Sequence, residues 1–172
     1  MTIRLILATI AALSLSACAA TRDLTAPVEP LGDFRLGFTV VVPSPNYTKA
    51  PVSRTAEAEE WKEPLKAAFE ERFKRFEGDS FYHLGVIVEG YALAPPGIPV
   101  VLSPKSVLIF SLTVVEDATE TQLNPDPHQM TVLEEFSVTS VIGSGLLMSK
   151  EAQIEGLAEA AARAAEKYLR TK

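Results

Sequence analysis

The segment from Lys150 to about Arg170 predicts one amphipathic helix, and it restricts the fold more than any other part of the chain. Its apolar side chains recur at intervals of three and four residues, which places them along one face of a helix. The helix is rich in alanine and contains Gly156, so we expect it to pack closely on a flat sheet, with Ser149 as its N-cap. The stripe consists of Ile154, Leu157, Ala158, Ala161, Ala165, Tyr168 and Leu169.

A second helical pattern lies between about residues 57 and 76. Its apolar positions again recur at helical spacing, and they are Trp61, Leu65, Ala68, Phe69, Phe73 and Phe76. Pro64 leaves two possible starting points for this helix. If the helix begins near Glu60 the proline costs little, whereas a start near Thr55 predicts a kink.

Four segments have the composition or alternation of β-strands, namely 34–42, 81–93, 106–117 and 129–142. In the third, Leu108, Phe110 and Leu112 alternate with polar residues and predict a buried face. Three prolines follow Val42, and we expect them to end the first strand. The order β-α-β-β-β-α predicts a single α+β domain over residues 34–172. We expect two layers, a mostly antiparallel four-stranded sheet with two helices on one face.

The N-terminus has the composition of a secretory signal peptide over residues 1–17. Arg4 is its only charge, and an apolar run of eleven residues follows. Crossing a bilayer takes about 20 apolar residues, so the run is too short for a membrane anchor. The signal ends in Leu15, Ser16, Ala17 and Cys18, and Cys18 is the only cysteine of the chain. One interpretation of these residues is an ordinary signal peptide in which this cysteine occurs by chance.

The sequence Leu-Ser-Ala-Cys resembles the lipobox of bacterial lipoproteins. The resemblance implies that signal peptidase recognises Leu15, Ser16 and Ala17 and that acyl chains such as palmitate are attached to Cys18. Several acyl chains anchor a protein stably to a membrane. Ala19 stands where inner-membrane retention often uses Asp, which implies the outer membrane, with the domain facing the periplasm. Residues 18–33 then form a proline-containing tether, or alternatively an edge strand.

The element order and the segment "TVVEDATETQL" (113–123) behind a lipobox resemble small periplasmic lipoproteins. Examples are the auxiliary lipoproteins of ABC transporters and uncharacterised proteobacterial lipoprotein families. The resemblance implies a cell-envelope role, and it assigns no catalytic residue.

The charge balance argues against nucleic acid as a partner. Without Arg4, the chain from Cys18 has 15 basic and 22 acidic side chains, a net charge of −7. Phosphates need clustered lysines and arginines, and this chain has no basic cluster. Anionic headgroups would also repel such a domain, so we expect the lipid alone to hold it to the membrane.

The sequence contains no recognisable catalytic or metal-binding pattern, and we predict no cofactor. It has no G-x-S-x-G motif, and its two histidines, His83 and His128, have no second ligand at metal-binding spacing. His83 shares a strand face with Ile87 and Glu89 in the predicted second strand.

One loop combines four prolines with exposed-looking apolar residues, the segment 94–104. Apolar loops either cover the end of the core or form a contact patch. The candidate contact residues are Ile98, Val100, Val101 and Leu102. Together these features predict a binding or adaptor lipoprotein that docks on an envelope protein. The alternative is a carrier of, or an enzyme acting on, lipid or cell-wall molecules.

Overall fold

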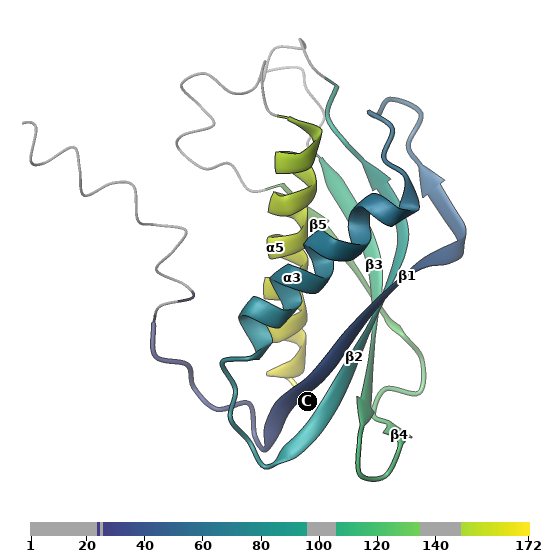
Figure 1. Ribbon diagram of the computed structural model, residues 1–172. Helices are drawn as coiled ribbons and strands as arrows, with labels where there is room; N and C mark the ends of the chain where they lie inside the picture. Colours follow the sequence, from purple (N-terminus) through teal and green to yellow (C-terminus); the bar gives the residue numbers. More distant parts are fainter. Residues whose placement is uncertain (1–23, 25, 96–105, 135–148) are drawn as a thin grey trace, which may run out of the picture.

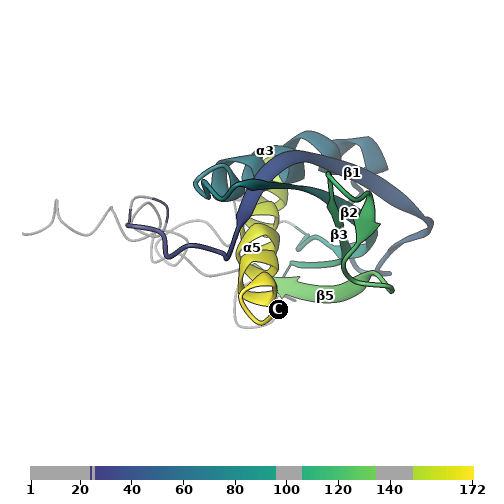
Figure 2. The same ribbon diagram turned by 90° about the horizontal axis from the view of Figure 1, so that it is seen from below.

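The computed structural model describes Leu24 and residues 26–95, 106–134 and 149–172. Over these residues a five-stranded sheet packs against two helices that lie on the same side of it (Figures 1 and 2). The α+β fold with a mostly antiparallel sheet is therefore confirmed. The elements are β1 (Phe34–Lys49), the 3-10 turn η2 (Ala58–Trp61), α3 (Lys62–Phe73), β2 (Ser80–Ala92), β3 (Val107–Glu116), β4 (Thr121–Gln122), β5 (His128–Leu133) and α5 (Lys150–Leu169).

The sheet combines one parallel pair with antiparallel pairs. β1 runs parallel to β2, and α3 lies in the crossover that such a pair requires. β2 pairs with β3 antiparallel, and β3 pairs with both β4 and β5. The prediction of four strands was wrong by one, because two residues of the connection after β3 form the short strand β4. The predicted fourth strand corresponds to β5 as far as Leu133, and its residues 135–142 lie outside the described part of the chain.

The first strand does not end at the prolines. β1 continues through Pro43 and Pro45 to Lys49, so the prediction that these residues end it was wrong. β1 lies at the edge of the sheet with β2 as its only neighbouring strand in the described chain. An edge strand tolerates proline because one row of its N–H groups is not needed for pairing.

The helix after β1 begins late enough to accommodate Pro64. Residues 58–61 form a 3-10 turn, and α3 starts at Lys62, which makes Pro64 its third residue. Because the N–H groups of a first turn have no partner within the helix, the proline costs little there. At the other end of the chain, the Ser149 hydroxyl accepts a hydrogen bond from the Ala152 N–H at 3.1 Å, which confirms Ser149 as the N-cap of α5.

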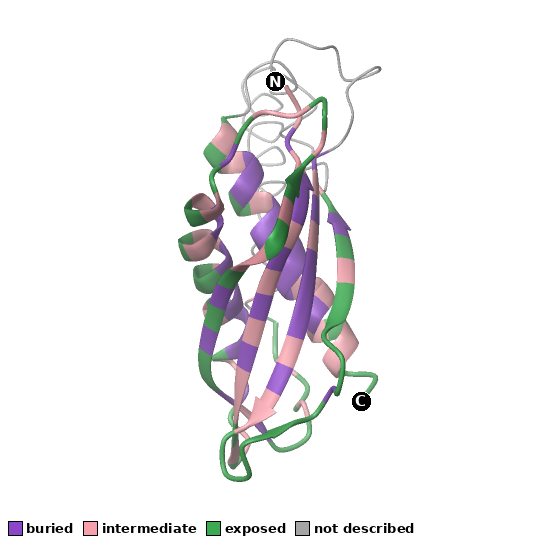
Figure 3. Cartoon of the chain, turned by 90° about the vertical axis from the view of Figure 1, so that its right-hand side faces the viewer, coloured by how far each residue is buried: buried purple, intermediate pink, exposed green. Residues whose placement is uncertain are grey.

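The core fills the space between the sheet and the helices. The predicted faces of β3 and α5 are buried, with Leu108, Phe110, Leu112 and Leu157 completely inaccessible to solvent. From α3 and the turn before it, Trp61, Leu65, Phe69 and Phe73 are equally inaccessible. Figure 3, which faces the sheet from the side without helices, shows buried and more exposed residues alternating along the strands.

An ion cluster joins the two helices at the edge of this core. Arg72 of α3 contacts the Glu166 carboxylate of α5 at 2.7 Å, and their side chains are 7% and 12% exposed. Arg170 contacts the same carboxylate at 2.7 Å and Arg75 at 3.5 Å. Burial raises the pKa of Glu166, but the hydrogen bonds from Arg72 and Arg170 outweigh burial and leave the pKa below its usual value.

Aromatic hydroxyl groups hold the connection from β1 to α3 against the sheet. The Tyr91 hydroxyl accepts from the Ala56 N–H at 2.9 Å, and the Tyr47 hydroxyl donates to the Ala56 carbonyl at 3.0 Å. The Trp61 indole N–H in turn donates to the Tyr47 hydroxyl at 2.8 Å. These bonds fix the C-terminal part of β1 next to β2, where the candidate site lies.

Candidate functional site on the uncovered face of the sheet

The face of the sheet that the helices leave uncovered carries several large apolar side chains. On β1, Phe38, Val40 and Val42 are 54%, 46% and 42% exposed. They alternate with the buried residues Thr39 and Val41, so they all point away from the helices. These three residues are called the β1 strip below.

A bulge in β1 sets the direction of the β1 strip. Leu36 pairs with Tyr82 and Thr39 with Leu84, so Gly37 and Phe38 together lie opposite the single residue His83. An extra residue of this kind leaves a backbone N–H without its ladder partner. The His83 ring takes that place, since its Nδ1 accepts from the Phe38 N–H at 3.3 Å and the ring stacks on Phe38 at 3.7 Å. A β-carbon on Gly37 would lie 2.4 Å from the imidazole, so the bulge requires glycine there.

The hydrogen bonds of His83 indicate its tautomer. Because Nδ1 accepts from a backbone N–H, the ring proton lies on Nε2, which contacts the Asp117 carboxylate at 2.8 Å. Both ring nitrogens are therefore engaged with this chain's own groups. His83 stabilises the bulge through both of its ring nitrogens.

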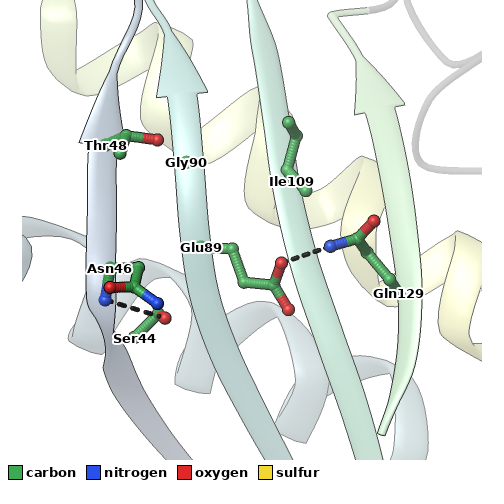
Figure 4. A pocket seen from close by; sticks show the side chains of 7 residues that line it. All are labelled: Ser44, Asn46, Thr48, Glu89, Gly90, Ile109 and Gln129. Carbon is green, nitrogen blue, oxygen red and sulfur yellow. Dashed lines mark hydrogen bonds between the residues drawn. The ribbon is translucent and has the colours of Figure 1, made fainter.

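A polar depression of about 430 Å³ lies further along the same face (Figure 4). Ser44, Asn46 and Thr48 line it from β1, and Glu89 lies opposite them on β2. Figure 4 shows the Glu89 side chain reaching across β3 toward Gln129 of β5. We call this depression the Glu89 pocket, and its lining is Ser44, Asn46, Thr48, Glu89, Gly90, Ile109 and Gln129.

The Glu89 pocket forms where strand pairing is interrupted on both sides of one residue. Between β2 and β3 the register passes from Val88 to Gly90 and omits Glu89. Between β1 and β2 it passes from the Pro43–Val88 pair to the Thr48–Gly90 pair, so residues 44–47 lie opposite Glu89 alone. Bulges bend a strand and redirect its side chains, and they are frequent next to functional sites.

Two neutral groups hold the Glu89 carboxylate in place. One oxygen accepts from the Ser111 hydroxyl and the other from the Gln129 amide. Gly90 allows Thr48 to come close, because a β-carbon at Gly90 would lie 2.9 Å from the Thr48 hydroxyl oxygen. The pocket therefore presents one carboxylate among hydroxyl and amide groups.

The residues proposed from the sequence as functional lie elsewhere in the chain. Leu15, Ser16, Ala17 and Cys18 and the loop residues Ile98, Val100, Val101 and Leu102 lie outside the described residues. His83 does share the uncovered face with Glu89, as predicted. Sequence reasoning missed the pocket itself, although Gly37 and Gly90 within strand patterns are the usual signal of a bulge.

Residues 24, 26–95, 106–134 and 149–172 contain no group of three or more His, Cys, Asp or Glu side chains arranged to hold a metal ion. Among the same residues, no helix combines the length and apolar character needed to cross a membrane.

Comparison with known proteins gives low similarities. No family model and no curated protein matches the sequence. A candidate lipoprotein from Caulobacter crescentus has 12% identity and a TM-score of 0.40, over 77% of this chain and 88% of that chain. A DUF330-family protein from Xanthomonas campestris has 12% identity and a TM-score of 0.43, over 84% and 86% of the two chains. A minor lipoprotein from Acinetobacter baumannii has 16% identity and a TM-score of 0.30, over 72% and 94%. Solved structures similar to this chain thus include proteins named as lipoproteins, at values too low to carry a functional assignment.

Proposed function

We propose that this chain is a lipid-anchored, non-catalytic binding protein of the bacterial cell envelope. Acyl chains on Cys18 would hold it at the outer membrane, facing the periplasm, where it docks on an envelope protein as an adaptor. The observation that carries the binding role is the β1 strip, three half-exposed apolar side chains in a row on the sheet face that neither α3 nor α5 covers. Contiguous exposed apolar surface is a common property of interaction sites.

Charge favours a protein over a lipid surface as the occupant of the β1 strip. The chain from Cys18 carries a net charge of −7, so anionic headgroups would repel it. Within the described residues β1 is also an edge strand, and the part of its outer edge before Pro43 offers backbone groups that an extended segment of a protein partner can pair with. Apolar side chains beside such an edge therefore suit a polypeptide better than a membrane.

Site-specific photo-crosslinking in intact cells tests the docking surface. A photoreactive amino acid at Val40 should give one discrete adduct with an envelope protein, whereas the same group at Glu71, exposed on α3, should give none. Val40→Asp should reduce docking, measured as loss of the adduct from a probe at Val42, because a buried charge opposes apolar contact. Equal crosslinking from Val40 and Glu71 would contradict the assignment of this face.

The anchor is tested by Cys18→Ser. This change should abolish palmitate labelling and leave the protein unprocessed or free of the membrane, because no thiol remains for acylation. The measurements are metabolic labelling with palmitate and fractionation of membranes, with a chain that retains Cys18 as control. Labelling that persists in the variant would disprove the lipoprotein assignment without affecting the crosslinking experiment.

A further inference from the structure

We propose that the Glu89 pocket binds a small ligand in which a primary ammonium group lies next to hydroxyl groups, as in an amino sugar. This goes beyond docking of a protein at the β1 strip, because the pocket lies further along β1 and has different chemistry. Five of its seven lining residues carry a hydroxyl, amide or carboxylate group, whereas the strip is apolar.

The charge of the pocket selects a cation. Glu89 is the only charged residue among the seven that line it. In the described part of the chain no lysine or arginine forms an ion pair with Glu89, and its hydrogen-bond donors, Ser111 and Gln129, are neutral. A partly buried carboxylate without a counter-charge attracts a cationic ligand more strongly than a fully solvated one does. An anionic ligand would find no positive side chain in this lining.

The remaining acceptor positions of Glu89 suit an ammonium group. Here each oxygen of Glu89 already accepts one hydrogen bond. An ionised carboxylate can accept about four, so single positions remain on each oxygen. A compact ammonium with three rotatable donors can use such single positions.

The opposite wall of the pocket suits the hydroxyl groups of the ligand. Ser44, Asn46 and Thr48 occur at alternate positions of β1 and line the same depression. Their hydroxyl and amide groups both donate and accept hydrogen bonds, as sugar hydroxyls do. The volume of about 430 Å³ lies within the range of about 300–1,000 Å³ that is typical of small-molecule sites.

Calorimetric titration of the purified protein with two sugars tests the proposal. Glucosamine carries the ammonium group, and N-acetylglucosamine has the same ring without the charge. The titrations are made at low salt and slightly acidic pH, where the amine of glucosamine is protonated. Glu89→Gln removes the charge and keeps the contacts, because the Gln129 amide can turn to offer its oxygen. Glu71→Gln removes an exposed charge from α3 and is the matched control.

We expect glucosamine to bind at least tenfold more tightly than N-acetylglucosamine. Glu89→Gln should weaken glucosamine binding at least tenfold, while Glu71→Gln leaves it unchanged, and added salt should weaken it further. Equal affinity for the two sugars, no effect of Glu89→Gln, or no saturable binding of glucosamine would overturn the proposal. If Glu89→Gln does not fold, the proposal is tested by comparing the affinities of the unaltered protein for the two sugars.

The β1 strip and the Glu89 pocket can be tested independently. Val40→Asp should abolish crosslinking to a protein partner and leave glucosamine affinity unchanged, because Val40 does not line the pocket. Loss of sugar binding in that variant would mean that the strip and the pocket form one site, which would contradict the inference as stated.

Discussion

Replacing Phe110 by alanine should lower the free energy of unfolding by about 3–5 kcal/mol, the usual loss for a phenylalanine removed from a core. The Phe110 side chain is completely buried, and its ring meets that of Phe69 edge to face at 6.3 Å. It lies in the central strand β3, between Val88 of β2 and Met130 of β5. The cavity left by the ring would therefore open where the sheet and α3 meet.

Urea denaturation measures this loss, and Phe81→Ala is the matched control. Phe81 lies in the neighbouring strand β2 but is 44% exposed, so the same truncation there should cost about 1 kcal/mol or less. On the other side of the interface, Leu157→Ala in α5 should cost about 2–5 kcal/mol. Similar losses for Phe110 and Phe81 would contradict the assignment of the buried face.

Glu166→Ala should cost about 2–4 kcal/mol at neutral pH, because it removes the carboxylate on which arginines of both helices converge. Arg72 is almost fully buried and would lose its charged contact with Glu166. The control is Glu159→Ala on the same helix. Glu159 is 60% exposed and lies 3.9 Å from Arg163, so its removal should cost less than about 0.5 kcal/mol.

The contribution of Glu166 to the free energy of unfolding should decrease as the pH falls. Its pKa in the folded chain is lower than its usual value, so the folded state binds fewer protons there than the unfolded state does. The stabilisation is complete above the unfolded pKa of about 4.3 and is lost as pH falls through the folded pKa. The difference in unfolding free energy between Glu166→Ala and the unaltered chain should therefore shrink from pH 7 to pH 3. A constant difference over that range would contradict the ion cluster.

The parts of the fold that depend on one unbroken periodicity could be predicted from the sequence. The apolar stripe of α5 and the buried face of β3 are regular. Spacing alone therefore predicts which side of the helix or strand each residue faces. The order of the elements then fixes the layers. The end of β1 could not be predicted, because proline stops an interior strand but is tolerated at an edge, and the position of a strand in the sheet is a tertiary property.

The candidate site could not be predicted because it depends on breaks in periodicity. In β2 the buried side chains are those of Leu84, Val86 and Val88, and then that of Tyr91, because Gly90 is buried but has no side chain. The shift to Tyr91 marks the bulge at Glu89, but the opposing bulge comes from residues 44–47, about 40 positions earlier. Only the register between the two strands shows that both breaks meet at one carboxylate.

The parallel pairing of β1 has a consequence for the order of folding. Phe34 pairs with Ser80, 46 residues later, whereas Ala92 pairs with Val107 across 15 residues. Loop-closure entropy makes the longer contact about 1 kcal/mol more costly to form, so β1 should join after the β2–β3 hairpin. Until then β1 is an apolar extended segment that could pair with another unfolded chain. Pro43 and Pro45 limit that risk, since they interrupt the N–H row on which an intermolecular ladder would grow. The two prolines that the finished edge strand merely tolerates thus serve as gatekeepers against aggregation in the partly folded chain.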